Sequence, residues 1–138
     1  MTVVRVGERP LTVDDRPAWC DVVGIGLFRI RPNSRFDRHF HDSPEYWLIY
    51  EGKAKVAVGD QTYYVQAGDV VCTPSGTEHD IVEIYEEMEG FYFEEPVPES
   101  GRIGRLHRDD TAAQGHPIPL VPSPTDFPSA TRRGVIVS

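Results

Sequence analysis

Short runs rich in apolar residues, several of which alternate with polar residues, recur along most of the chain. They cover residues 19–31, 46–50, 53–58, 61–66, 70–73, 79–85 and 88–94. Alternation with a period of two is typical of β-strands that have one face buried. Turn-forming sequences such as Gly59-Asp60 and Pro74-Ser75-Gly76 separate the runs, and no stretch has the period of an amphipathic helix. The pattern therefore predicts an all-β sandwich or barrel.

The two ends of the chain differ from this central part. Residues 1–18 contain a short β-prone piece at 2–6 and are expected to form an N-terminal arm, able to add a strand to this or another subunit. Residues 96–138 hold seven of the 12 prolines and show little periodicity. We expect this Pro-rich tail to be irregular and to pack on the barrel or extend from it. The barrel itself is assigned to residues 19–95. Deletion of 117–138 is expected to leave it folded, and 134–138 to be able to dock as an edge strand.

Composition narrows the functional classes. The 138 residues carry a net charge of -8, with 9 Lys/Arg against 18 Asp/Glu in residues 1–95, which argues against a nucleic-acid partner. Cys20 and Cys72 form neither a disulfide framework nor a CxxC pair. No N-terminal signal peptide and no membrane-length apolar run is present, so we expect a cytoplasmic protein without a membrane partner.

The sequence Arg-His-Phe-His-Asp-Ser-Pro-Glu at 38–45 concentrates metal-binding residue types. His39 and His41 are two residues apart, so they face the same side of an extended strand, and Glu45 follows a turn. Imidazole and carboxylate donors suit a divalent transition metal, namely Fe, Mn, Ni or Zn. His79 follows a second turn-rich stretch, and a strand facing the first two histidines across a small barrel would bring it to the same ion.

These two stretches resemble the motifs of the cupin superfamily. The first motif reads G-x5-H-x-H-x3/4-E-x6-G, and it matches His39, His41, Glu45 and Gly52, with Asn33 in place of the first glycine. Asparagine tolerates left-handed turn geometry, so this departure is a mild one. The second motif reads G-x5-P-x-G-x2-H-x3-N. Its matching positions are Gly68, Pro74, Gly76 and His79, and Glu83 replaces the asparagine.

The 15 residues between the motifs look like the short spacing of small single-domain cupins. The resemblance implies a small β-barrel with jelly-roll topology, a homodimer, and one divalent metal held by His39, His41, Glu45 and His79. A barrel in which these residues pack without metal is the competing interpretation.

Other residues are candidates for the wall of a pocket. Trp47 shares the parity of Glu45 and is expected to point inward with Ile49, whereas Leu48 and Tyr50 point outward. The remaining candidates are Tyr64, Cys72, Tyr92, Arg29 and Arg38. Core packing is the competing interpretation for the aromatic residues, and a small buried side chain for Cys72. The arginines either grip a carboxylate or phosphate or lie on solvated strand faces.

The cupin resemblance does not fix the reaction, because the fold hosts many chemistries. The leading hypothesis is an isomerase- or lyase-like enzyme that acts on a small sugar or hydroxy/keto acid, with the metal as a Lewis acid. The alternatives are an Fe(II)-dependent dioxygenase and a non-catalytic small-ligand-binding protein. Asp37 and Glu83 are candidate proton shuttles, and His107 and His116 are expected at the surface.

Overall fold

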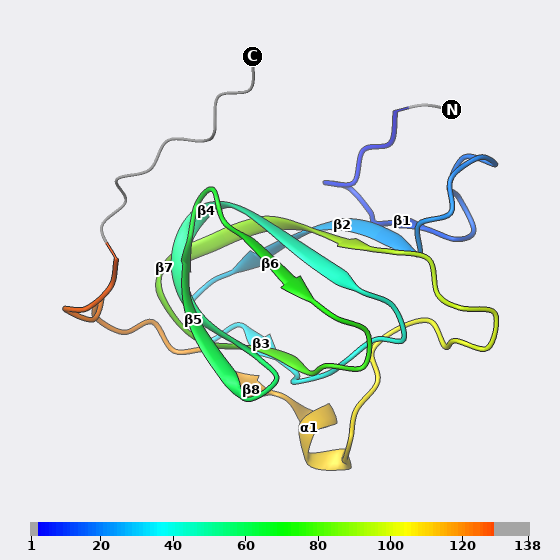
Figure 1. Ribbon diagram of the computed structural model, residues 1–138. Coiled ribbons are helices and arrows are strands. Elements are labelled where there is room, and N and C mark those ends of the chain that lie inside the picture. Colours follow the sequence, from blue (N-terminus) through cyan, green and yellow to red (C-terminus); the bar gives the residue numbers. More distant parts are fainter. Residues whose placement is uncertain (1–2, 129–138) are drawn as a thin grey trace.

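The computed structural model describes residues 3–128, and strands make up most of its regular structure (Figure 1). The elements are β1 (Leu11–Thr12), β2 (Gly24–Ile30), β3 (Arg35–Phe36), β4 (Glu45–Val58), β5 (Gln61–Gln66), β6 (Val70–Thr73), β7 (His79–Glu94), α1 (Asp110–Gln114) and β8 (His116–Pro117). The prediction of an all-β fold is confirmed.

Two long central strands organise the main sheet. Its order is β1-β2-β7-β4-β5, with β6 paired to the first part of β4, and all of these neighbours are antiparallel. The strands β3 and β8 form a separate pair on the lower side of Figure 1. The sheet bends so that its inner faces enclose one core.

The bend in β4 depends on a glycine. The register between β4 and β7 shifts at Ile49/Glu51 and again at Glu51/Lys53, which brackets Gly52. Gly52 has φ +96°, and a Cβ there would collide with the carbonyl oxygen of Glu87. Glycine therefore permits a bulge, and the strand continues through it. For this reason one strand replaces the two that were expected at 46–50 and 53–58.

Several other expected boundaries are also wrong. The strands expected at 79–85 and 88–94 are one strand, β7, because the acidic residues at 86–87 lie within the ladder and do not form a turn. Residues 3–6 form no strand, and the first strand begins at Leu11. The strand expected at 19–31 is confirmed only for Gly24–Ile30.

The core lies between the bent halves of the sheet. It includes Val56, Ile81, Ile84 and Met88, none of which is more than 1% exposed. Along the start of β4 the side chains alternate as expected, since Trp47 and Ile49 are buried whereas Leu48 and Tyr50 are exposed. Asn33 has φ +65°, which agrees with the expected left-handed turn.

The C-terminal segment packs against the barrel as far as the structure describes it. After β7 the chain runs to α1 and then back past β8 along the lower side of Figure 1. Ile118, just after β8, is fully buried in the core, and its backbone bonds to Ser34 and Asn33 at 2.8 Å each. This burial argues against the expectation that residues 117–138 are dispensable. The edge strand expected at 134–138 lies outside the described residues.

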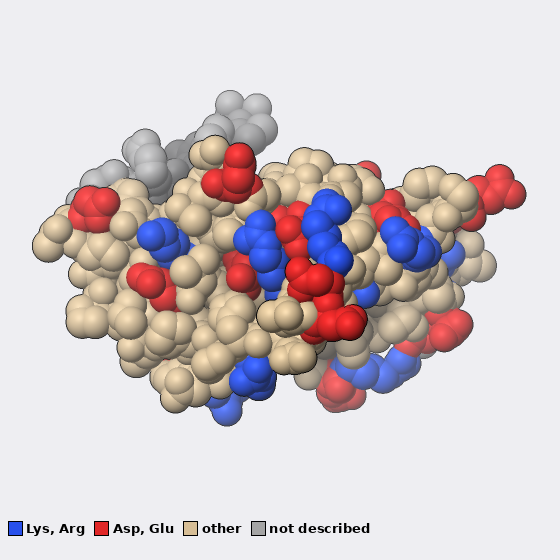
Figure 2. All heavy atoms as spheres, turned by 90° about the horizontal axis from the view of Figure 1, so that it is seen from below, with Lys and Arg blue, Asp and Glu red and all other residues tan. Residues whose placement is uncertain are grey.

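The barrel and this segment are joined by ion pairs. Arg102 pairs with Asp42 at 2.9 Å, and Arg108 approaches Glu78 at 3.5 Å. Figure 2 shows basic and acidic side chains side by side near the middle of the face seen from below. Among residues 3–128, no helix has the length and apolar character needed to cross a membrane.

Candidate metal centre

The backbone brings the three histidines together, although His79 is 40 residues from His39. His39 and His79 are direct partners in an antiparallel bridge, with N···O distances of 2.8 and 3.3 Å. The carbonyl of His41 accepts a hydrogen bond from the N–H of Gly76 at 2.8 Å, so the turn before His79 is attached to the same segment. Glu45 begins β4 beside them.

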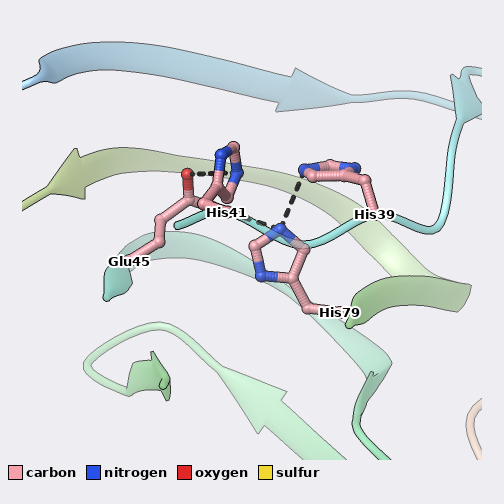
Figure 3. Close-up of side chains that lie close together, drawn as sticks. All are labelled: His39, His41, Glu45 and His79. Carbon is pink, nitrogen blue, oxygen red and sulfur yellow. Dashed lines mark hydrogen bonds and ion pairs between the residues drawn. The ribbon is translucent and has the colours of Figure 1, made fainter. Parts of the chain in front are cut away.

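The four side chains converge on one point (Figure 3). One donor atom from each of His39, His41, Glu45 and His79 lies within 4.8 Å of all the others, and each residue is at most 6% exposed. The Nε2 atoms of His39 and His79 are 2.9 Å apart. The carboxylate oxygens of Glu45 lie 3.1 Å from His41 Nε2 and 3.4 Å from His79 Nε2.

The outer nitrogens of two histidines are held by backbone carbonyls. His41 Nδ1 is 2.9 Å from the carbonyl oxygen of Gly104, and His39 Nδ1 contacts that of Asp37. A carbonyl only accepts, so each Nδ1 donates and each Nε2 is left with a lone pair. The Nε2 of His41 is buried and has no hydrogen-bond partner among the described residues. Donor atoms that converge at these distances suit a shared cation, so the donor set fits a divalent transition metal.

The protonation states agree with this arrangement. Burial lowers the pKa of His39 to about 4 and that of His79 to about 3, so both imidazoles are neutral at pH 7. Burial opposes ionisation of Glu45, but the neighbouring His41, Glu94 and His79 side chains hold its pKa at about 2. Burial also disfavours the charged form of His41, whose pKa is nevertheless raised by Glu45 and Glu94. The neutral imidazoles of His39 and His79 and the ionised carboxylate of Glu45 are the forms that bind metal, whereas a protonated His41 has to lose its proton on binding.

A cavity of about 480 Å³ opens onto the candidate ligands. Its wall includes His39, His41 and Glu45, the apolar residues Phe28, Phe36, Trp47 and Ile81, and the polar residues Arg29, Arg35, Tyr92, Glu94 and Arg105. The indole N–H of Trp47 donates to Glu45 at 2.7 Å, so this aromatic wall also orients a candidate ligand.

The structure brings some of the expected pocket residues to this cavity and leaves others elsewhere. Trp47, Tyr92 and Arg29 line it. Tyr64 and Cys72 line a second cavity of about 300 Å³, and Cys72 is exposed, which contradicts its expected burial. Arg38 is absent from both walls, because its guanidinium group bonds to the Gly59 carbonyl at 2.6 Å and to Glu78 at 3.3 Å.

Glu94 is the titratable carboxyl group of the cavity that the sequence reasoning missed. It lies at the end of β7, is 9% exposed, and approaches His41 Nδ1 at 3.4 Å. Burial and the neighbouring Glu45 carboxylate raise its pKa to about 7. The signal was available, since Glu94 shares the strand parity of Tyr92, which was already placed in the pocket.

The expected proton shuttles Asp37 and Glu83 do not line the cavity. Asp37 contacts His39 and His107, whereas Glu83 accepts a hydrogen bond from Tyr85 at 2.8 Å. His107 and His116 were expected at the surface. Both are half-buried, and they bond to Asp37 at 2.6 Å and to Asp80 at 2.7 Å.

Comparison with known proteins gives the same fold. A model of the cupin domain family matches residues 26–90, a range that contains all four candidate ligands. The uncharacterized protein y4oW of Sinorhizobium fredii is 34% identical over a region covering 60% of this chain and 45% of the relative. The match therefore spans less than half of that relative's length.

Several solved structures are similar in fold. An RmlC-like cupin family protein with a double-stranded β-helix fold from Methanocaldococcus jannaschii has a TM-score of 0.52 and 21% identity, covering 58% of this chain and 75% of that one. The DMSP lyase DddQ of Ruegeria pomeroyi has a TM-score of 0.52 and 20% identity, covering 59% of this chain and 42% of that one. The fold expected from the two sequence motifs is confirmed.

Proposed function

Because the chain belongs to the cupin superfamily, we propose that it is a metal-dependent enzyme that carries out lyase- or isomerase-type proton transfer on a small hydroxy or keto acid. The proposal is carried by one observation. The cavity that exposes three candidate metal ligands also contains Glu94, a carboxyl group that is not one of those ligands.

A divalent transition metal held by His39, His41, Glu45 and His79 would supply Lewis-acid polarisation of a substrate oxygen. Glu94 would take up or deliver the proton at its carboxylate, since it lies beside His41 within the same cavity. Phe28, Phe36 and Trp47 form an apolar part of the wall beside these residues.

The cationic residues of the cavity favour an acid over a neutral sugar. Arg35 lines the wall and takes part in no ion pair within residues 3–128, since its Nη2 donates to the carbonyls of Gln114 and Gly115 at 3.0 Å each. Its remaining N–H groups are therefore available to a carboxylate. Arg105 also lines the cavity and is 57% exposed.

The experiment is a substrate screen in which metal and oxygen are controlled separately. Protein loaded with Mn, Zn, Ni or Fe is incubated with small hydroxy acids, keto acids and sugars, with and without oxygen, and products are followed by NMR. We expect an acid to be converted in the absence of oxygen. When the reaction is run in deuterated water, we expect the product to contain deuterium from the solvent.

Glu94→Gln is expected to lower turnover by at least about 100-fold while the metal stays bound, because it removes the proton-transferring group. Glu95→Gln is the matched control, since Glu95 bonds to Tyr46 and does not line the cavity. Iron-dependent oxygen consumption would instead indicate a dioxygenase. Binding of an acid with no turnover under any condition would indicate a non-catalytic binding protein, and either result would overturn the proposal.

A further inference from the structure

The segment 104–107 belongs to none of the strands β1–β8 and pairs through one isolated bridge, at Leu106. This segment, here called the tail strand, lies directly beside the residues that carry two candidate ligands. Phe40 and Leu106 pair in an antiparallel bridge whose two N···O distances are both 2.9 Å. Phe40 stands between His39 and His41, so the bridge fixes the tail strand against that part of the backbone. The tail strand lies outside the 26–90 range that matches the cupin domain.

Gly104 holds His41 through its backbone. Its carbonyl oxygen accepts the hydrogen bond from His41 Nδ1 at 2.9 Å. Gly104 has φ +102°, a conformation that residues with a side chain rarely adopt, although a Cβ there would meet no atom within 4 Å. The orientation of this carbonyl therefore depends on glycine for conformational reasons, with no steric crowding involved.

The other end of the tail strand binds the carboxylate of Asp37. The carboxylate of Asp37 bonds to His107 Nε2 at 2.6 Å and forms an ion pair with Arg105. The backbone carbonyl of Asp37 contacts His39 Nδ1, and its carboxylate oxygen lies 3.5 Å from the same nitrogen. Arg105 and His107 thus restrain the residue that orients His39.

We infer that the tail strand positions His39 and His41 for metal binding, through the Gly104 carbonyl and through Asp37. Arg105 and His107 are positioning residues that act through Asp37. Partners of the outer imidazole nitrogen fix the ring orientation, and their loss typically weakens metal binding by about 10–100-fold. The inference rests on the proposed function only in requiring that the four candidate ligands bind a metal.

The test is a titration of the full chain with Co²⁺, followed by visible absorption and calorimetry. Gly104→Ala is expected to weaken Co²⁺ binding by about 10–100-fold and to shift the absorption bands, because His41 loses its orienting carbonyl. Gly68→Ala is the matched control. Gly68 has φ +98° and equally open surroundings, so it carries the same backbone strain away from the ligands.

A second pair of variants tests whether Asp37 positions His39. Asp37→Asn is expected to weaken Co²⁺ binding about 10-fold or more, because it weakens the interactions of residue 37 with Arg105 and His107. Asp42→Asn is its control, since Asp42 bonds to Arg102 and likewise ties the C-terminal segment to the barrel. Thermal unfolding of the metal-free proteins identifies any variant that fails to fold. If one variant fails to fold, the Co²⁺ affinities of the other variant and its control test the inference.

The outcomes separate the two claims. A wild-type protein that binds no Co²⁺ would refute the metal-dependent function, and the positioning role with it. A wild type that binds Co²⁺, with Gly104→Ala and Asp37→Asn no weaker than their controls, would refute only the positioning role. Weaker binding in both variants than in both controls supports it.

Discussion

Substitution of Ile118 by alanine tests whether the C-terminal segment completes the core of the barrel. Ile118 is 0% exposed, and it packs with residues such as Ile84 and Met88 that lie on β7. Its N–H and carbonyl both bond to the turn at 33–34. The side chain therefore fills space that no other part of the described chain occupies.

The magnitude follows from what Ile118→Ala removes. Three buried carbons are lost, and at about 0.8 kcal/mol each their transfer to water accounts for about 2.4 kcal/mol. Incomplete collapse of the cavity raises the expected loss of unfolding free energy to about 3–4 kcal/mol. Leu120→Ala is the matched control, since Leu120 lies two residues further on and is 50% exposed. Its expected loss is below about 1 kcal/mol.

The assay is urea unfolding followed by tryptophan fluorescence, with a chelator present so that metal binding does not add to stability. With an m value of about 2 kcal/mol/M, Ile118→Ala should lower the midpoint by about 1.5–2 M at unchanged m. If Ile118→Ala lowered the midpoint no more than Leu120→Ala does, the C-terminal segment would not belong to the core, and the argument from burial would fail.

Two further predictions concern stability and assembly. Burial lowers the pKa of His116, but the interactions with its neighbours, chiefly the Asp80 carboxylate, together raise it by more, so the pKa lies above its usual value. The pair therefore stabilises the fold below pH 6.5, and this stabilisation is lost as pH rises through the raised pKa. His116→Gln should therefore lower the free energy of unfolding more at pH 6 than at pH 8. The expected difference is only about 0.5 kcal/mol, because the imidazole is partly exposed. An equal loss at both pH values in urea unfolding would contradict this prediction. We also propose a homodimer that uses a row of exposed apolar residues on neighbouring strands, Leu27, Phe91, Leu48 and Val70. Leu48→Lys should then give a monomer in light scattering while the exposed control Leu120→Lys stays dimeric, and a monomeric wild type would refute the proposal.

The strands and the candidate ligands were predictable because they rest on local patterns. Short runs rich in β-forming residues at 61–66 and 70–73, each bounded by turn sequences, predict strands that the structure has at the same residues. The spacing of His39 and His41 places both side chains on one face, and the turn before His79 sets where the next strand begins. Each of these signals lies within about ten residues of chain.

The missed features depend on contacts between distant segments. Ile118 follows a proline in a stretch without periodicity, so nothing in its neighbourhood marks it as a core residue. Gly104 and His107 matter because the tail strand pairs with Phe40, a contact across more than 60 residues. At Gly52 the local signal was ambiguous, since a glycine at positive φ permits either a turn or a bulge. The cross-strand register with β7 decides in favour of the bulge.

The most direct test of the account is the metal content of the untagged protein, measured by elemental mass spectrometry after purification and again after reconstitution. The account predicts about one divalent transition metal ion per chain. In His41→Ala, which removes one donor, the affinity for that ion should fall by at least about 10-fold. A wild type that holds no metal and takes up none, or a His41→Ala variant with undiminished affinity, would contradict the assignment of the site.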